Sequence, residues 1–569
     1  MVLIDINSRG NFVSLSQKKN MQQEKAMFLA IHPNDNVLVA LKNLDKGTTI
    51  HYNDYSFDLQ ENIPAKHKIF LDDMQVGDEV YMYGDVVGKM LRPAKQGSLM
   101  TTTNLQHAAS PYSYRDFQYQ WMPPVTKAFE GRTFNGYLRS DGRAGTANYW
   151  LFIPTVFCEN RNLDVIKEAL HNALGYAVTD KYKLYAEHLV NAYENSEDIA
   201  TIDFNLTENH PDKRLFKNID GIKFLNHQGG CGGTRQDAAI LSKLLASYAD
   251  HPNVAGVTVL SLGCQHLQVQ QFMDDLKERN PSFDKPLFIF EQQSSQSEEA
   301  LIKDAIKRTF IGLTDANKIE RQAVPINKLV IGVKCGGSDG FSGISANPAV
   351  GYTADLLAAV GGKILLAEFP ELCGAEQNLI DRCTNKNAAE KFIHLMQAYD
   401  EQAHLVGSGF HMNPSPGNIK DGLITDAIKS AGAAKKGGTS PVTDVLDYTE
   451  PALKPGLNLV CTPGNDVEAT TGQAASGATL ILFTTGLGTP TGNPVCPTIK
   501  VSTNTSLAKR MKDIIDIDCG SVIEGEKTIE QMGAEILEYC IKAASGEIIP
   551  KAVLLGQDDF IPWKRGVSL

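Results

Sequence analysis

Five apolar, strand-like runs in the last three quarters of the chain each end in a turn that carries a reactive side chain. The runs span residues 222–225, 256–262, 328–333, 363–367 and 480–483, and the turns after them hold His227 and Cys231, Cys264, Lys334 and Cys335, Glu368 and Glu371, and Thr484. Ligands of open α/β sheets bind just outside the carboxyl ends of the strands, which converge on one edge. The pattern therefore predicts an α/β enzyme in which these side chains, Thr484 aside, surround one cleft.

Composition limits the partners that such an enzyme can have. The 569 residues carry a formal net charge of −12, which argues against nucleic acid or an anionic membrane as the main partner. No apolar stretch approaches the roughly 18 residues of a membrane helix, and the N-terminus lacks a signal core, so we expect a cytoplasmic protein. The ten cysteines form no C-x-x-C pair, which indicates reduced thiols rather than a local metal ribbon.

The order of the segments predicts several domains. Residues 1–26 are polar and predicted to be a disordered leader, while 27–110 contain short β-like runs between glycine turns, typical of a small β-rich domain. Residues 111–133 are expected to be a linker. From 134 onward strands alternate with helices, which predicts mostly parallel sheets with helices on their faces. A polar stretch near residue 325 divides this part into α/β regions 134–325 and 326–569.

Apolar spacing within these regions also predicts individual helices. Residues 163–174, 234–248 and 528–544 place apolar side chains at helical intervals, and Ser297 is suited to cap a further helix.

The glycine-rich segment 134–148 carries Arg139, Arg143 and Asn148 just before a strand. Arginine is suited to bind a carboxylate with two parallel hydrogen bonds. The alternative is a surface loop in which Asp141 pairs with an arginine.

The turn from His227 to Gly233 lies between a strand and a helix. The imidazole of His227 and the thiol of Cys231 are possible ligands for a transition metal. Alternatively, the backbone N–H groups at the start of the helix could bind an anion. A purely structural turn is the third reading, and the local spacing does not decide among them.

Three glutamates follow the 363–367 run within nine residues: Glu368, Glu371 and Glu376. Carboxylates of this kind hold divalent cations or act as general acid and base. A solvated acidic turn is the alternative, although the apolar residues before it argue against full exposure. The chain has neither G-x-x-x-x-G-K-[ST] nor a G-x-G-x-x-G that opens a helix, which argues against a nucleotide-dependent enzyme.

Taken together, these motifs resemble the altronate dehydratase and galactarate dehydratase family from about residue 31 onward. The segments that carry the resemblance are 31–41, 63–68, 136–148, 227–233, 263–265, 334–347, 368–376, 417–418, 429–430, 435–437 and 484–500. The resemblance implies an N-terminal SAF-like domain and dehydration of an aldonate or aldarate to a 2-keto-3-deoxy sugar acid. It also implies a divalent metal, ferrous iron or manganese, and a small sugar acid as the partner; a homo-oligomer is left open.

One departure concerns the SAF-like domain. Where the family pattern has a His-x-His pair, this chain reads Met100-Thr101-Thr102-Thr103. If those histidines touch substrate or metal in relatives, His32, His67 or His107 take their place here, or the substrate is a different acid.

Removing water from a 2,3-dihydroxy acid requires a base for the C2 proton, an acid for the C3 hydroxyl, and positive charge on the enediolate. For the substrate we expect Lys334, Arg143 and Lys500 at the carboxylate, with Arg139, Asn148 and His32 as further contacts. For the metal we expect His227, Cys231, Cys264 and Glu368. For acid–base catalysis we expect Glu371 as base and Asp339 or His67 as acid.

Two other interpretations remain open from the sequence. An iron–sulfur cluster on Cys231, Cys264 and Cys335 would keep the dehydratase function with a different cofactor. A non-catalytic sugar-acid-binding homologue is the second, because the histidine pair is missing. D-Altronate is the favoured substrate.

Overall fold

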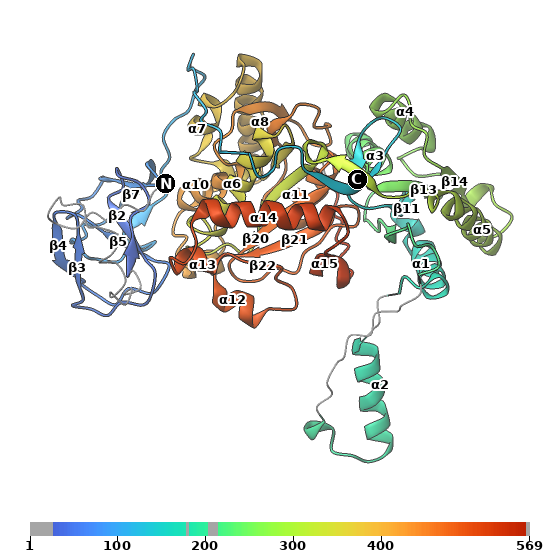
Figure 1. The fold of residues 1–569 in the computed structure, drawn as a ribbon, viewed down its shortest axis with the longest axis horizontal. Coiled ribbons are helices and arrows are strands. Elements are labelled where there is room, and N and C mark those ends of the chain that lie inside the picture. Colours follow the sequence, from blue (N-terminus) through green and yellow to red (C-terminus); the bar gives the residue numbers. More distant parts are fainter. Residues whose placement is uncertain (1–26, 178–180, 203–213, 565–569) are drawn as a thin grey trace.

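The alternating strands and helices fold into two parallel sheets, preceded by a small antiparallel β domain (Figure 1). The computed structural model describes residues 27–177, 181–202 and 214–564, so the predicted leader 1–26 lies outside the described residues. The predicted fold class, a small SAF-like β domain followed by α/β regions with parallel sheets, is confirmed.

The N-terminal domain consists of three small antiparallel sheets, β1-β2-β5, β3-β4 and β6-β7-β8. Its strands are β1 (Phe28–Leu29), β2 (Val37–Ala40), β3 (Thr49–Tyr52), β4 (Tyr55–Asp58), β5 (Lys68–Phe70), β6 (Glu79–Met82), β7 (Asp85–Met90) and β8 (Leu105–Gln106). Residues 107–126 then run without regular structure along the C-terminal region, where the Tyr119 hydroxyl donates to the carbonyl of Thr439 at 2.8 Å.

The second region has a parallel sheet of order β12-β11-β13-β14 and an antiparallel sheet of order β10-β9-β15. Its strands are β9 (Thr133–Leu138), β10 (Ala144–Gly145), β11 (Tyr149–Pro154), β12 (Gly221–Phe224), β13 (Val254–Ser261), β14 (Leu287–Glu291) and β15 (Gln322–Pro325). Its helices are α1 (Asn160–Leu174), α2 (Lys181–Glu194), α3 (Arg235–Ala249), α4 (Val269–Arg279) and α5 (Glu298–Ala316). Helix α2 projects away from the rest of the chain (Figure 1).

The C-terminal region is built on a seven-stranded parallel sheet of order β18-β19-β17-β16-β20-β21-β22. Its strands are β16 (Val330–Cys335), β17 (Lys363–Leu366), β18 (Val442–Leu446), β19 (Gly456–Val460), β20 (Leu480–Thr485), β21 (Thr498–Ser502) and β22 (Ile517–Asp518). Its helices are α6 (Ala346–Ala359), α7 (Glu376–Asp381), α8 (Lys386–Leu405), α9 (Pro416–Lys420), α10 (Asp426–Ala434), α11 (Asp466–Ala475), α12 (Thr505–Arg510), α13 (Gly520–Ile523), α14 (Ile529–Ala544) and α15 (Lys551–Leu554). The strand order reverses beside β16, which is where open α/β sheets bind ligands.

Helix starts follow the local capping chemistry. The Ser297 hydroxyl accepts from the N–H of Ala300, as predicted, and Thr234 and Thr528 form capping boxes at α3 and α14. The five predicted strand runs correspond to β12, β13, β16, β17 and β20. Within the described residues no helix has the length and apolar character needed to cross a membrane.

Both faces of the seven-stranded sheet are covered. One face packs under α6 and α14, with Val333, Leu482 and Val501 in a core shared with Leu537. Side chains on the opposite face, such as Ile481 and Phe483, join a core that continues into α3 of the second region. Lys334 lies on this second face, because it is in register with Phe483.

Candidate active site

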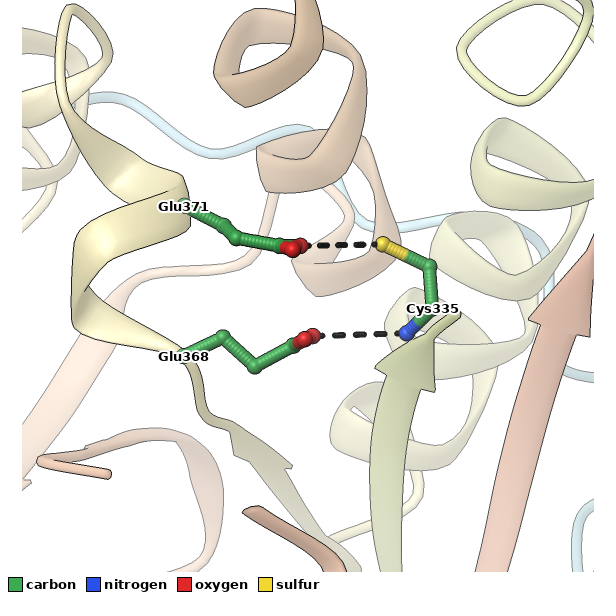
Figure 2. A group of neighbouring side chains, drawn as sticks. All are labelled: Cys335, Glu368 and Glu371. Atoms are coloured by element: carbon green, nitrogen blue, oxygen red, sulfur yellow. Dashed lines mark hydrogen bonds between the residues drawn. The ribbon is translucent and has the colours of Figure 1, made fainter. Parts of the chain in front are cut away.

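Three buried side chains meet where β16 and β17 end. Cys335 is the last residue of β16. The short 3-10 helix η5 (Phe369–Leu372) follows β17; Glu368 is the residue just before this helix, and Glu371 lies within it. Figure 2 shows both glutamates pointing toward Cys335: Glu371 lies 3.3 Å from its sulfur, and Glu368 accepts from its backbone N–H at 3.3 Å. Glu368 has φ of 72°, a left-handed conformation that costs a residue with a Cβ about 1 kcal/mol. Such strain often accompanies functional sites.

Lys334 is the central cation of this cluster. Its ammonium contacts the Glu368 carboxylate, the Asp466 carboxylate at 2.9 Å and the carbonyl of Cys335 at 2.8 Å, and its side chain is fully buried. Burial opposes the charge, but Glu368 and then Asp466 outweigh it and hold the pKa of Lys334 well above its usual range. The lysine is therefore charged in the folded protein.

A second ion pair joins Glu371 to Lys429 of α10, with 2.8 Å between Nζ and the carboxylate. Burial raises the pKa of Glu371, but the charges of Lys429, Lys334 and Lys436 together outweigh it and lower the pKa to about 2, so the carboxylate is ionised. By contrast, burial and the neighbouring Glu371 raise the pKa of Glu368 against the opposing charges of Lys334 and Lys436. The two carboxylates therefore differ in their readiness to take up a proton.

A third lysine contacts the thiol. Lys436, from the segment after α10, places its Nζ 2.7 Å from Cys335 Sγ and 2.8 Å from Glu368. Burial, followed by the charge of Glu371, raises the pKa of Cys335 to about 12, so the sulfur is a protonated thiol in this arrangement. We refer to Lys334, Cys335, Glu368, Glu371, Lys429 and Lys436 as the lysine–carboxylate cluster.

The cluster opens onto a cavity of about 480 Å³, which we call the β16 cavity. Its lining residues come from the turns after β16, β17, β19 and β20, from α8 and α10, and from the segment between these two helices: Cys335, Gly336, Gly337, Ser338, Glu371, Tyr399, Asn413, Ser415, Asn418, Lys429, Pro463, Gly464, Asn465, Asp466 and Leu487. The wall thus combines one ammonium, two carboxylates, several amides and hydroxyls, which suits a small polar acid.

Cys335, Glu368 and Glu371 also form a group that could hold a metal ion. One donor atom from each lies within 4.8 Å of the others. A thiolate with two carboxylates is a donor set for a divalent transition metal, so the residues fit the expected cofactor in type and spacing. An ion there would take over contacts that Lys436 and Lys429 make to Cys335 and Glu371.

Lys500, expected at the substrate carboxylate, lies on β21 behind the cluster. Lys334, Phe483 and Lys500 are neighbours in register across β16, β20 and β21, and Lys500 Nζ lies 3.5 Å from the centre of the Phe483 ring. The Nζ is buried without a hydrogen-bond partner among the described residues, and it does not line the β16 cavity. Burial lowers the pKa of Lys500 to about 7.

Replacing Lys500 by Met is therefore expected to stabilise the protein. The pKa of Lys500 is lower in the folded protein than in the unfolded chain. The buried charge therefore destabilises wild type by its full amount below pH 7, and this destabilisation decreases as the pH rises toward about 10. We expect Lys500→Met to raise the free energy of unfolding by about 1 to 4 kcal/mol at pH 6, with a smaller gain at pH 9. Denaturant unfolding at both pH values measures this; a gain that grows with pH contradicts the assignment.

Asp339, expected as the acid, is a fully buried carboxylate with several partners. It accepts from Ser342 Oγ at 3.1 Å and Thr503 Oγ1 at 3.1 Å, and it pairs with Lys66 of the N-terminal domain at 3.0 Å. It does not line the β16 cavity. His67 is half-buried beside Lys66 with Nδ1 3.2 Å from the carbonyl of Ala65, and burial lowers its pKa. Its neighbour Lys66 forms ion pairs with Asp339 and Asp421 of the C-terminal region.

The other expected contacts in the N-terminal domain also lie outside the cavity lining. His32 is exposed, and its Nδ1 accepts from the N–H of Asn34 at 3.2 Å. In place of the expected histidine pair, the Thr101 and Thr103 hydroxyls hydrogen-bond to each other at 2.8 Å.

The prediction of one cleft is wrong for His227, Cys231 and Cys264. These residues follow β12 and β13 of the four-stranded sheet, whereas Lys334, Cys335, Glu368 and Glu371 follow strands of the seven-stranded sheet. His227 and Cys231 line a separate cavity of about 360 Å³. The physical reason is that strand ends converge only within one sheet, and the chain forms two.

Neither ring nitrogen of His227 is free for a metal. Its Nε2 lies 2.8 Å from the carbonyl of Pro154, Nδ1 accepts from the N–H of Gly229, and burial lowers its pKa to about 4. Cys264 is exposed and accepts from the Gln293 amide at 3.2 Å. Since Cys335 belongs to the other cavity, the three cysteines proposed for an iron–sulfur cluster do not share a site.

The segment around Arg143 forms a structural network of the second region. The guanidinium of Arg143 binds Asp141 and Asp250, each through two nitrogens. Arg139 is buried and donates to the carbonyl of Pro252 at 2.7 Å and to Asn148 Oδ1 at 3.0 Å. None of these side chains lines the β16 cavity, so the surface-loop reading with an internal Asp–Arg pair is closer to the structure.

Arg143→Lys is accordingly expected to weaken folding rather than catalysis. A lysine cannot bind both Asp141 and Asp250 with paired hydrogen bonds, so we expect a loss of about 1 to 2 kcal/mol of unfolding free energy. The folded variant should keep its kcat/KM. Thermal unfolding and steady-state kinetics test this together, and a large fall in kcat/KM with unchanged unfolding would return Arg143 to the substrate site.

Several members of the site were not among the residues expected from the sequence. Lys429, Lys436 and Asp466 lie on α10, after α10 and at the start of α11, far from any of the five strand-end turns in sequence. Lys429 and the 435–437 segment did belong to the motifs of the resemblance, which was the available signal for them. Asp466 had no such signal.

Three family models match consecutive parts of the chain. They are the altronate/galactarate dehydratase SAF domain over residues 26–108, the D-galactarate dehydratase/altronate hydrolase second domain over 136–317, and the D-galactarate/altronate dehydratase C-terminal domain over 326–568. Their order is the order of the three structural regions described above.

Relatives of known activity match over nearly their whole length. Altronate dehydratase of Bacillus subtilis (strain 168) is 33% identical over 530 residues, covering 92% of this chain and 96% of the relative. Altronate dehydratase of Escherichia coli (strain K12) is 31% identical over 520 residues, covering 91% and 95%. Galactarate dehydratase (L-threo-forming) of the same strain is 30% identical over 526 residues, covering 92% and 93%. The chain therefore belongs to the altronate and galactarate dehydratase family, a family of sugar-acid hydro-lyases.

Proposed function

We propose that the β16 cavity dehydrates D-altronate to a 2-keto-3-deoxy sugar acid. The observation that carries this proposal is the pairing of a lysine ammonium with an ionised carboxylate in one wall, Lys429 with Glu371, with a second carboxylate, Asp466, nearby. Such a wall can bind a carboxylate and move a proton at the adjacent carbon. Two of the relatives described above are altronate dehydratases.

The character of the cavity favours an acid with one carboxylate. Among the described residues, Lys429 is the one cation that lines the cavity. The part of the wall farther from Glu371 carries uncharged groups such as Asn413, Ser415 and Asn418. A second carboxylate at that end would lose hydration without gaining a counter-ion. Galactarate, the substrate in the name of the third relative, is a diacid and is the alternative.

Each residue of the cavity wall and the cluster has a separate role in the proposed reaction. Cys335, Glu368 and Glu371 would hold a divalent metal, ferrous iron or manganese, which supplies positive charge for the developing enediolate. Lys429 binds the substrate carboxylate from the cavity wall. Because Glu371 belongs to the metal-holding group, Asp466 is the wall carboxylate that remains to take the C2 proton. Protonated Asp466 can then give a proton to the departing C3 hydroxyl, and the resulting enol becomes the 2-keto product.

Lys334 orients this arrangement without lining the cavity. It links Asp466 to Glu368, so the carboxylate assigned as base and a carboxylate assigned to the metal share one cation. This contact fixes their relative position before substrate binds, which is the condition for efficient proton transfer.

A substrate panel tests the proposal. Metal-reconstituted enzyme is incubated with D-altronate, other aldonates and galactarate, and formation of a 2-keto-3-deoxy acid is measured. We expect kcat/KM to be highest for an aldonate. A higher kcat/KM for galactarate would mean that the diacid, and not D-altronate, is the substrate. Binding of sugar acids without formation of product would mean that the chain is a non-catalytic homologue.

Metal removal gives a separate prediction. We expect chelator-treated, metal-free protein to lose dehydratase activity and to regain it with Fe²⁺ or Mn²⁺ under reducing conditions, because the donor set includes a thiol. Metal content measured on Cys335→Ser should fall relative to wild type. Full turnover by metal-free protein would refute the cofactor assignment.

A further inference from the structure

The turn after β16 carries a buried hydroxyl that the reaction scheme does not yet use. Ser338 lines the β16 cavity, is 3% exposed, and its Oγ has no hydrogen-bond partner among the described residues. Buried hydroxyls in native proteins almost always have a partner, and exceptions ask for one outside the chain. A serine hydroxyl can both donate and accept, which matches a sugar hydroxyl.

The backbone at Ser338 is held in place by its neighbours. Asn418 donates to the carbonyl of Ser338 at 2.8 Å, and the next residue, Asp339, is buried. On the preceding side, a Cβ at Gly336 would lie 2.4 Å from the Asp466 carboxylate. The turn therefore packs tightly against Asp466 and presents Ser338 at one place in the cavity wall.

A lysine of the N-terminal domain anchors the same turn. Lys66 Nζ reaches Asp339 at 3.0 Å and Asp421 at 2.9 Å. The two domains meet closely here, because a Cβ at Gly340 or Gly422 would lie 2.4 Å from the carbonyl oxygen of Lys66. Among the described residues, Lys66 is the one member of the 63–68 motif that forms ion pairs with the C-terminal region.

We propose that Ser338 is a substrate-binding residue for a hydroxyl of the sugar acid, and that Lys66 of the N-terminal domain positions it through Asp339. The proposal rests on the proposed function, since it takes the sugar acid as the ligand of the β16 cavity. It also gives the N-terminal domain a part in the active site through Lys66, although neither His32 nor His67 lines the β16 cavity.

The first test compares Ser338→Ala with Ser430→Ala. Ser430 also has a buried Oγ without a partner in the described residues, but it does not line the cavity, so it controls for loss of a buried hydroxyl. We expect Ser338→Ala to raise the Kd for D-altronate, measured by calorimetry, and the KM by about 10-fold, with an unchanged unfolding midpoint. Ser430→Ala should leave both constants as in wild type.

The second test asks whether Lys66 acts through the turn. Lys66→Met should raise the KM, Lys66→Arg should restore it in part, and the effect of Lys66→Met should shrink in a Ser338→Ala background. A role in stability alone would give equal effects in both backgrounds. Fully additive effects on KM would therefore remove Lys66 from the proposal.

The outcomes separate the two proposals. If wild type dehydrates a sugar acid and Ser338→Ala binds it as tightly as wild type does, the Ser338 assignment fails while the proposed function stands. If wild type turns over no acid of the panel, the proposed function fails and the Ser338 assignment falls with it.

Discussion

Lys334→Met is expected to lower the free energy of unfolding by about 3 to 5 kcal/mol and to abolish dehydration. The substitution keeps most of the side-chain volume but removes the fully buried cation that joins the buried Glu368 to the partly exposed Asp466. Glu368 keeps its contact with Lys436, but the buried carboxylate loses one of the two cations that balance it, and removing one partner of a buried ion pair is costly. Denaturant unfolding and steady-state kinetics with D-altronate measure the two effects.

Two further variants control this result. Lys386→Met removes an exposed lysine that pairs with Glu390 on α8, and it should leave the unfolding midpoint and the activity almost unchanged. Lys334→Met combined with Glu368→Gln removes both charges, so it should recover part of the stability but none of the activity. A fully active Lys334→Met enzyme would remove the lysine from the mechanism.

Glu371→Gln is expected to reduce kcat/KM by about 100- to 10,000-fold and to lower the free energy of unfolding, because it leaves the buried Lys429 ammonium without its counter-ion. The amide is nearly isosteric but cannot provide the negative charge that Lys429 and a metal require from this position. Metal content should fall as well, which separates a ligand role from a role in proton transfer alone.

Glu376→Gln is the matched control. Glu376 is buried in the same acidic segment but does not line the β16 cavity. Burial raises its pKa to about 7, so its neutral form is already populated near pH 7, and an amide can still accept from the N–H of Gly374. We expect nearly wild-type kinetics. Equal losses in both variants would mean that Glu371 acts through packing of the segment rather than in the reaction.

Much of the fold could be predicted because its local signals agree with each other. The apolar runs before Cys264, Lys334 and Glu368 were each continuous, and glycine turns or capping residues such as Ser297 marked where the next element begins. Runs of this kind are typical of strands buried on both faces.

The joint cleft could not be predicted, because the sequence does not reveal how strands are divided between sheets. Strand β13 before Cys264 and strand β16 before Lys334 look alike, yet they belong to different sheets. The two cavities are nevertheless neighbours: Tyr399 of the β16 cavity stacks at 5.4 Å on Trp563, which lines the cavity of His227.

The roles of individual lysines and arginines could not be predicted from the sequence either. Arg143 and Lys429 have the same charge, but one is bound by two aspartates in the second region and the other lies in the β16 cavity. Both pair with carboxylates of the protein, as their residue type predicts, and the tertiary structure decides which of them also faces a cavity where a substrate can bind.

The most direct test of the central claim is proton NMR of D-altronate with metal-reconstituted enzyme in D₂O. Abstraction of the C2 proton followed by loss of the C3 hydroxyl predicts a 2-keto-3-deoxy acid, formed in equal amount to the altronate consumed, with one solvent deuterium at C3. Asp466→Asn, which removes the carboxylate assigned as base from the cavity wall, should form this product at least 100-fold more slowly. Altronate that stays unchanged with wild type, or that is consumed equally fast by Asp466→Asn, would contradict the account.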